Sequence, residues 1–227
     1  MTRTLRIDPH VHTRFSYDAS ASVEAVLEHA AAAGLDGLVV TDHDAIVGSR
    51  RAVELAPDFG LVALPGVEVS TAHGHLLALG VTERPEPHRP LGETMDAIRD
   101  AGGVAVVPHP FRLTSHGVRR SHLADPDAVE IFNACTLLSY RNRQAAAYAD
   151  RNGLPGVGSS DAHTPSAVGD GFTTVEVADS GHRTDVDPVA ILDAIRAGRT
   201  TAHGQRASLL RYLNKYAVNA WLAAARR

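Results

Sequence analysis

Short apolar runs alternate with helix-forming segments along most of the chain, and this alternation constrains the fold more than any other feature. The strand-like runs lie at 6–10, 37–41, 61–70, 76–81, 104–107, 129–133, 156–159 and 172–177, and the helix-forming segments at 22–33, 45–56, 91–101, 137–152 and 188–197. Repeated βα units of this kind build a parallel sheet or barrel. We therefore predict an α/β fold with about seven parallel strands.

The length of the chain is enough for one sizeable core, because 44% of its 227 residues are hydrophobic. We expect a single domain over 1–227, in which the segment 206–227 forms a C-terminal helix that docks on the rest. This segment has five basic residues and no acidic ones, although the whole chain has a formal net charge of -4. The negative total argues against a mainly electrostatic nucleic-acid binder, so nucleic acid is not an expected partner.

Cysteine content and hydropathy indicate the expected location. Cys135 is the only cysteine, so it has no partner within the chain for a disulfide. No apolar run reaches the roughly 18 residues that a membrane-spanning helix needs. We expect a reduced, cytoplasmic protein with no membrane contact.

Imidazoles and carboxylates follow the apolar runs, where the strands of an α/β fold meet the loops that hold its active site. His10 and His12 come first, and because they are two residues apart on a strand, both rings face one side and can reach one ion. Similar polar clusters lie at 41–44, 66–68, 108–110 and 160–163. Imidazole and carboxylate ligands without thiolates suit exchangeable Zn, Mn or Fe, so we predict a multinuclear metal centre.

The five clusters, in this order, resemble those of the PHP (polymerase and histidinol phosphatase) domain family. The residues that carry the resemblance are His10-Val11-His12, Thr41-Asp42-His43, Gly66-Val67-Glu68, Pro108-His109-Pro110 and Asp161-Ala162-His163. The resemblance covers roughly residues 5–201. It implies a distorted seven-stranded (β/α)7 TIM-like barrel and the activity of a metal-dependent phosphoesterase.

The resemblance also implies two or three divalent metal ions as cofactors and assigns their ligands. One ion is expected among His10, His12, Glu68 and Asp161, a second between Glu68 and His109, and a third among Asp18, His43 and His163. Relatives commonly complete the second site from the end of the next strand, where this chain has Asn133, a weaker ligand than histidine. His75 is a further candidate, either as a ligand or as a structural hydrogen-bonding residue.

The expected mechanism follows from the charge of the ions. Adjacent divalent ions lower the pKa of a shared water and neutralise phosphoryl oxygens, so a metal-bound hydroxide attacks phosphorus in line. His43 or His163 protonates the leaving alkoxide, and Asp161 completes the expected catalytic set. Arg112 and Arg119, in the long loop 111–127, are candidate phosphate-binding residues, although they also fit ordinary surface charges.

Hydrolysis of a small phosphorylated metabolite is the predicted function, specifically the release of phosphate from a phosphomonoester. Three alternatives stay open: a nuclease or oligonucleotide phosphodiesterase, an amidohydrolase-like C–N hydrolase, and a noncatalytic metal-binding regulatory module. Aromatic residues make up only 5% of the chain, which argues against the stacking platforms of a nuclease. The nearly complete ligand set argues against a noncatalytic module, whereas Asn133 keeps that alternative open.

Overall fold

The computed structural model describes residues 2–112, 114, 116–123, 125–136, 138–179, 181 and 185–205. The helix expected at 206–227 lies outside these residues. The described strands are β1 (Thr2–Val11), β2 (Gly37–Val40), β3 (Val62–Leu64), β4 (Gly66–Thr71), β5 (Gly74–Leu79), β6 (Val104–Val107), β7 (Ala128–Asn133), β8 (Gly156–Ser159), β9 (Gly171–Ala178) and β10 (Thr200–Gly204). The helices are α1 (Val23–Ala32), α2 (Val47–Leu55), α3 (Leu91–Asp100), α4 (Ser139–Asn152) and α5 (Pro188–Arg196), with short 3-10 helices η1 (Ala56–Phe59), η2 (Arg120–His122) and η3 (Pro165–Ala167).

The strands form two five-stranded mixed sheets, in the orders β10-β9-β1-β2-β3 and β4-β5-β6-β7-β8. The α/β class is thus confirmed, but two runs expected in the parallel set, β5 and β9, are antiparallel to the strands they pair with. Strands β4 and β5 are antiparallel because only Ala72 and His73 separate them, too few residues for the crossover that parallel neighbours need. Strand β9 returns antiparallel to β1. A single closed seven-stranded barrel is not observed among the described strands.

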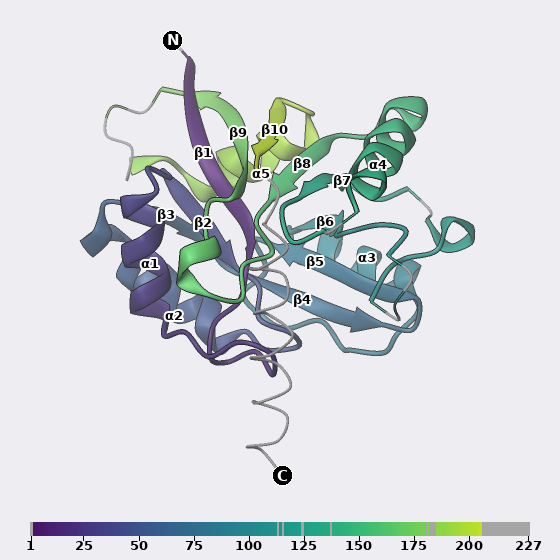
Figure 1. Ribbon diagram of the computed structural model, residues 1–227, viewed down its shortest axis with the longest axis horizontal. Helices are drawn as coiled ribbons and strands as arrows, with labels where there is room; N and C mark the ends of the chain where they lie inside the picture. Colours follow the sequence, from purple (N-terminus) through teal and green to yellow (C-terminus); the bar gives the residue numbers. More distant parts are fainter. Residues whose placement is uncertain are drawn as a thin grey trace.

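The two sheets meet where their polar clusters lie. Val11, at the end of β1, is bridged to Ala162 just after β8, and His43, just after β2, is bridged to Glu68 in β4. The backbone hydrogen bond from His12 N to Ala162 O measures 2.8 Å. Figure 1 shows the first sheet with α1 and α2 on the left and the second sheet with α3 and α4 on the right. The ends of strands from both sheets therefore converge at the centre of the molecule.

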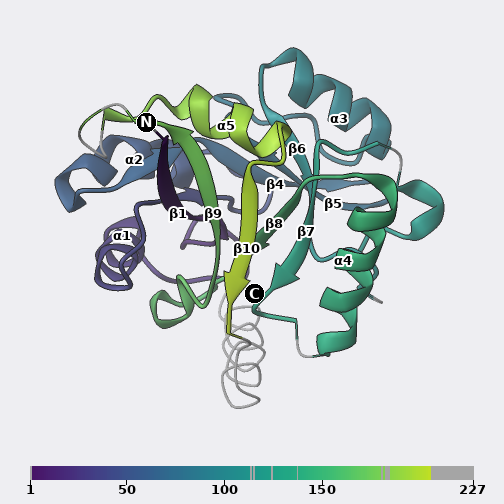
Figure 2. The same cartoon turned by 90° about the horizontal axis from the view of Figure 1, so that it is seen from above.

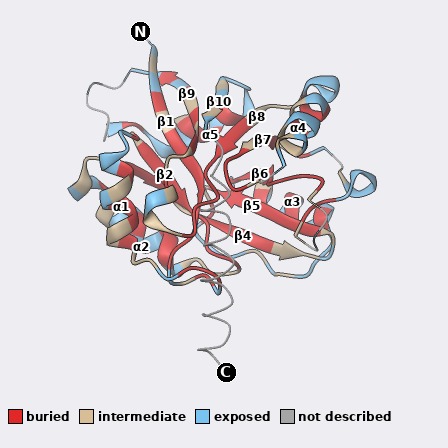
Figure 3. Ribbon diagram, viewed as in Figure 1, coloured by how far each residue is buried: buried red, intermediate tan, exposed pale blue. Residues whose placement is uncertain are grey.

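The largest apolar cluster lies between the sheets and contains side chains of both, together with α5. Val62 and Val104, the first residues of β3 and β6, belong to this cluster, as does Ile191 of α5. Helix α5 thus packs at the ends of the parallel strands opposite the polar clusters, and Figure 2 shows it crossing above β9. Figure 3 shows that the strands of both sheets are mostly buried and that exposure concentrates on the outer helices and loops.

Helix ends follow the expected local chemistry. The Ser22 hydroxyl accepts a hydrogen bond from Ala25 N at 3.2 Å and begins α1, while Gly34, with φ of 72°, follows its last turn. Asp187 caps α5 in the same way, and Pro188 occupies its first turn. No helix among the described residues is long and apolar enough to cross a membrane.

Candidate metal centre

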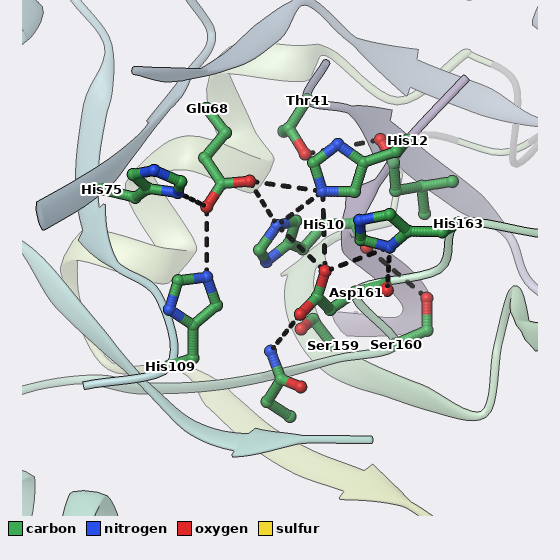
Figure 4. A network of polar contacts seen from close by, with 12 residues as sticks. His10, His12, Thr41, Glu68, His75, His109, Ser159, Ser160, Asp161 and His163 are labelled. Atoms are coloured by element: carbon green, nitrogen blue, oxygen red, sulfur yellow. Dashed lines mark hydrogen bonds and ion pairs between the residues drawn. The ribbon is translucent and has the colours of Figure 1, made fainter. Parts of the chain in front are cut away.

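Glu68, on β4, lies at the middle of a group of buried histidines. Its Oε2 is 3.0 Å from His10 Nε2 and 3.2 Å from His12 Nε2. Its Oε1 is 2.7 Å from His75 Nδ1 and 3.1 Å from His109 Nε2. The two oxygens of one carboxylate therefore face two different pairs of histidines, as Figure 4 shows. A carboxylate in this position can bridge two cations.

Local strand geometry brings the first histidine pair together. His10 and His12 project from the same face of β1, as predicted, and their Nε2 atoms lie 3.1 Å apart. Asp161 Oδ1 approaches the pair at 3.5 Å from His12 Nε2 and 3.8 Å from His10 Nε2. Asp161 follows β8 with φ of 52°, and His109 follows β6 with φ of 31°. Positive φ is uncommon outside glycine, so the backbone is strained at two of the points where side chains enter the site.

Asp18 gathers a further group of residues. Its Oδ2 is 2.8 Å from His163 Nε2 and 3.4 Å from His43 Nε2. His43 Nδ1 is in turn 3.3 Å from Glu68 Oε2, and the His12 and His163 ring centroids are 4.3 Å apart. The group implied by the family resemblance for a third ion is thus assembled next to the Glu68 group. Three sets of ligand atoms in the described part of the chain lie close enough together to hold an ion: His12, Asp18, His43 and His163; His10, His12 and Glu68; and His43, Glu68 and His75.

The sequence interpretation missed Glu130, a buried carboxylate on β7. Its Oε1 accepts hydrogen bonds from His10 Nδ1 at 3.0 Å and from the Ser159 hydroxyl. Its Oε2 accepts from His109 N at 2.6 Å and from Asn133 Nδ2 at 2.8 Å. Because Glu130 accepts the hydrogen bond from His10 Nδ1–H, Nε2 is the His10 ring nitrogen that faces Glu68. The available signal was a single carboxylate within the apolar run 128–132.

Asn133 and His75 make different contacts with the carboxylates of the site. The Asn133 amide donates to Asp161 Oδ2 at 3.2 Å as well as to Glu130, so its nitrogen faces the two carboxylates. His75, in contrast, directs a ring nitrogen at Glu68 Oε1. Buried Asn133 Oδ1 and His109 Nδ1 lack hydrogen-bond partners among the described residues.

Opposite charges in the site shift several pKa values strongly. Burial lowers the pKa of His12, but hydrogen bonding to Asp161 and Glu68 raises it to about 9. Burial also opposes charge on His10, yet the nearby carboxylates raise its pKa well above the ordinary value. Burial raises the pKa of Glu68, and the positive charges of His43 and His10 more than reverse this, holding it well below its usual range. The carboxylates therefore stay ionised and attract cations.

His109 differs from the other histidines of the site. Burial and the Arg112 guanidinium lower the pKa of His109 to about 4, so its imidazole is neutral at pH 7. Neutral imidazole nitrogen and ionised carboxylate oxygen are the forms that bind divalent cations. The donor set, with several nitrogens converging on the oxygens of one buried carboxylate, fits Zn, Mn or Fe.

A small cavity of about 120 Å3 opens onto this group of residues. The loop after β6 contributes Arg112, Thr114 and His116 to its wall. Arg112 Nη2 lies 3.7 Å from Asp161 Oδ2, and the His116 ring stacks on His75 with centroids 4.5 Å apart. Of the two arginines predicted to bind phosphate, Arg112 reaches the metal-ligand group, whereas Arg119 lines a neighbouring cavity.

The strand-end clusters of this site match a known family. The PHP domain family matches residues 8–161. The chain belongs to the PHP domain family. A second family, described as PHP-associated, matches residues 139–200 of this PHP protein.

Relatives of this PHP protein include proteins with and without a described activity. An uncharacterised protein of Methanocaldococcus jannaschii is 28% identical over 141 residues, which cover 57% of this chain and 82% of that protein. The phosphoribosyl 1,2-cyclic phosphate 1,2-diphosphodiesterase of Eggerthella lenta is 40% identical over 82 residues, which cover 34% of this chain and only 31% of that enzyme.

Solved structures share the fold. A two-domain protein of Bacteroides vulgatus that contains a predicted PHP-like metal-dependent phosphoesterase superposes with a TM-score of 0.71 at 21% identity, covering 94% of this chain and 70% of that chain. A lesion-specific endonuclease of Pyrococcus furiosus superposes with a TM-score of 0.63 at 16% identity, covering 88% of this chain and 58% of that chain. At these identities the likeness is one of fold.

Proposed function

We propose that this PHP protein releases phosphate from a small phosphomonoester at a centre of two or three divalent metal ions. One observation carries the proposal: the two oxygens of Glu68 face separate pairs of histidines. Hydrolysis of phosphoric esters is the activity that membership of the PHP family and the Eggerthella relative support. Cys135 is buried and is the single cysteine of the chain, which is compatible with the cytoplasmic location that we propose.

The ligand assignment follows the distances. His10, His12, Asp161 and Glu68 Oε2 would hold one ion, and His75, His109 and Glu68 Oε1 a second. Asp18, His43 and His163 would hold a third ion. We assign His75 to the second ion in preference to Asn133, because the Asn133 amide donates to Glu130 and Asp161. Bound Zn, Mn or Fe would lower the pKa of a water and neutralise phosphoryl charge.

The surrounding side chains would bind the ester and move the proton. Arg112 lies at the cavity wall, where its planar guanidinium can pair with phosphoryl oxygens. His43 and His163 also line the cavity, and whichever of the two rings is not bound to an ion can give a proton to the leaving alkoxide. Asp161 Oδ1 lies 3.5 Å from His163 Nδ1, where it stabilises positive charge on that ring.

Metal analysis combined with a phosphate-release screen tests the proposal. The purified protein, loaded with Zn, Mn or Fe, should bind at least two ions per chain and release phosphate from phosphomonoesters. His109→Ala should lose bound metal and reduce phosphate release by about 100-fold or more, because even indirect metal partners cost 10- to 100-fold. His88→Ala, a change at an exposed turn, is the control and should keep both.

Three outcomes would contradict the proposal. The first is that metal-loaded protein releases phosphate from no monoester, and the second is that His109→Ala is as active as the unchanged protein. Cleavage of single-stranded DNA or of amides in place of monoesters would instead favour a nuclease or a C–N hydrolase.

A further inference from the structure

A second cavity, of about 680 Å3, adjoins the cavity of the metal-ligand group. Arg112 and Thr114 line both cavities, so the two are neighbours across these side chains. The larger cavity lies among three segments: the turn between β4 and β5, the loop after β6, and the start of α4. A molecule with one phosphate at the metal-ligand group would extend past Arg112 into this space.

The described residues that line the larger cavity include positively charged side chains and no negatively charged ones. Arg112, Arg119, Arg120 and Arg141 are all part of its wall, and no carboxylate is. Within the described part of the chain, neither Arg119 nor Arg141 forms an ion pair, in contrast to exposed arginines elsewhere such as Arg50, which pairs with Glu83. Such a concentration of guanidinium groups without neutralising acids favours an anionic ligand.

Contacts of neighbouring side chains give this cavity a defined shape. His73, from the turn between β4 and β5, stacks on His122 of η2 with ring centroids 4.1 Å apart. Arg141 Nη1 donates to Gln144 Oε1 at 3.3 Å, and the Arg120 guanidinium lies over the Tyr148 ring at 5.9 Å. The His73–His122 and Arg120–Tyr148 contacts join the three segments, so the cavity is part of the fold and not a gap between unattached loops. Its volume is in the range of small-molecule sites.

We propose that this space, the arginine cavity, binds a second anionic group of the substrate. The substrate is then a small phosphomonoester that also carries a second phosphate or a carboxylate, which the guanidinium forks bind through paired hydrogen bonds. This inference rests on the proposed function and adds the substrate class. It assigns Arg112 to the reacting phosphate and Arg119 and Arg141 to the remote anion.

Three synthetic esters of matched length test the proposal: pentane-1,5-diol bisphosphate, 6-phosphooxyhexanoate and pentyl phosphate. Metal-loaded full-length protein should hydrolyse either or both of the two doubly anionic esters with a kcat/KM about tenfold or more above that of pentyl phosphate, beyond the statistical factor of two for the bisphosphate. The kcat/KM of the bisphosphate compared with that of the carboxylate ester shows which second anion is preferred. Arg119→Ala/Arg141→Ala should bring the ratio close to the statistical value.

Arg143→Ala is the matched control. Arg143 lies on α4 two residues beyond Arg141, but its guanidinium donates to Ser139 Oγ at 3.3 Å and does not line the arginine cavity. This variant should keep the preference for the doubly anionic esters. Equal kcat/KM for all three esters, or a preference that persists in the double variant, would overturn the arginine cavity as a subsite and leave the phosphatase proposal standing.

Calorimetric binding separates the two proposals if no ester is hydrolysed. Tighter binding of a doubly anionic ester than of pentyl phosphate, lost in the double variant, would keep the subsite and refute the proposed function. No difference in binding would refute both. A single-stranded oligonucleotide that binds more tightly than either doubly anionic ester, through the same arginines, would assign the arginine cavity to nucleic acid and overturn the proposal.

Discussion

At the scale of single residues, Glu130 links parts of the site that come from different strands. It accepts hydrogen bonds from His10 Nδ1–H, the His109 backbone N–H and the Asn133 amide. Burial raises the pKa of Glu130, but the positive charge and hydrogen bond of His10 outweigh this and lower it below its usual value. Glu130 therefore remains ionised and fixes which nitrogen of His10 faces the candidate ion.

Glu130→Gln should weaken metal binding while preserving the fold. The amide has the shape of the carboxylate but carries no charge, so it holds His10 Nδ1–H less firmly, and we expect a 10- to 100-fold loss in metal affinity. Competition with a chromogenic chelator measures this affinity. Glu176→Gln, at an exposed position of β9, should leave the affinity unchanged. Equal affinities for the two variants would show that Glu130 has no orienting role.

His12 makes metal binding dependent on pH. Its pKa rises from the ordinary 6.5 to about 9 in the folded protein. In the metal-free protein this shift contributes stability that is fully present below pH 6.5 and is lost as pH rises through about 9. A bound ion must displace this proton from His12. The release of this one proton should therefore raise metal affinity by up to about tenfold per pH unit between pH 6 and pH 8. A chelator competition that gives the same affinity at both pH values would contradict this assignment.

At the scale of elements, the β4–β5 hairpin connects the metal-ligand group to the arginine cavity. Glu68 of β4 and His75 of β5 belong to the metal-ligand group, while His73 and Gly74 at the turn of the hairpin line the arginine cavity. The His75 backbone N–H donates to His116 O at 2.9 Å, which attaches the loop after β6 to the hairpin. Movement of this loop would therefore affect both sites.

Gly74→Ala should disturb that attachment. Gly74 has φ of +114°, and an added Cβ would lie 2.9 Å from backbone atoms of Gly117 and Val118. We expect the free energy of unfolding to fall by about 1–3 kcal/mol, with a loss of phosphate release as the loop shifts. Urea unfolding and a phosphate assay measure the two effects. Gly92→Ala is the control, because its Cβ meets nothing within 4 Å; a Gly74 variant as stable and active as this one would refute the prediction.

At the scale of the whole molecule, one apolar cluster joins both sheets and α5. Ile191 of α5 is fully buried in it, whereas Val189 on the same helix is 54% exposed. The cluster holds the two sheets in the relative position that brings Glu68 to the histidines of β1. Stability of this core and assembly of the site are therefore coupled.

Ile191→Ala should lower the free energy of unfolding by about 2–5 kcal/mol, because it leaves a cavity where the sheets meet. Val189→Ala should change it by no more than about 0.5 kcal/mol, since the side chain is largely in solvent. Chemical denaturation of both metal-free variants makes the comparison. A similar small loss for both would mean that α5 contributes little to the core.

Particular residues show how far the sequence could predict this protein. The shared face of His10 and His12 and the cap at Ser22 were predictable because both depend on neighbours within a few residues. The direction of β5 was also predictable but was overlooked, because the connection between the runs 61–70 and 76–81 is too short for a parallel crossover. Glu130 was overlooked because one carboxylate in an apolar strand shows its role only when its distant partners are known.

The sequence by itself determined the α/β class and the placement of imidazoles and carboxylates at strand ends, because both follow from local periodicity and from residue chemistry. Only the tertiary structure decided that Glu68 faces His10 and His12 with one oxygen and His75 and His109 with the other. It also decided that Arg112 and Arg119 both line the arginine cavity, whereas Arg112 alone of the two also lines the cavity of the metal-ligand group. These relations join residues tens of positions apart, and they exist only after the two sheets have packed around their common core.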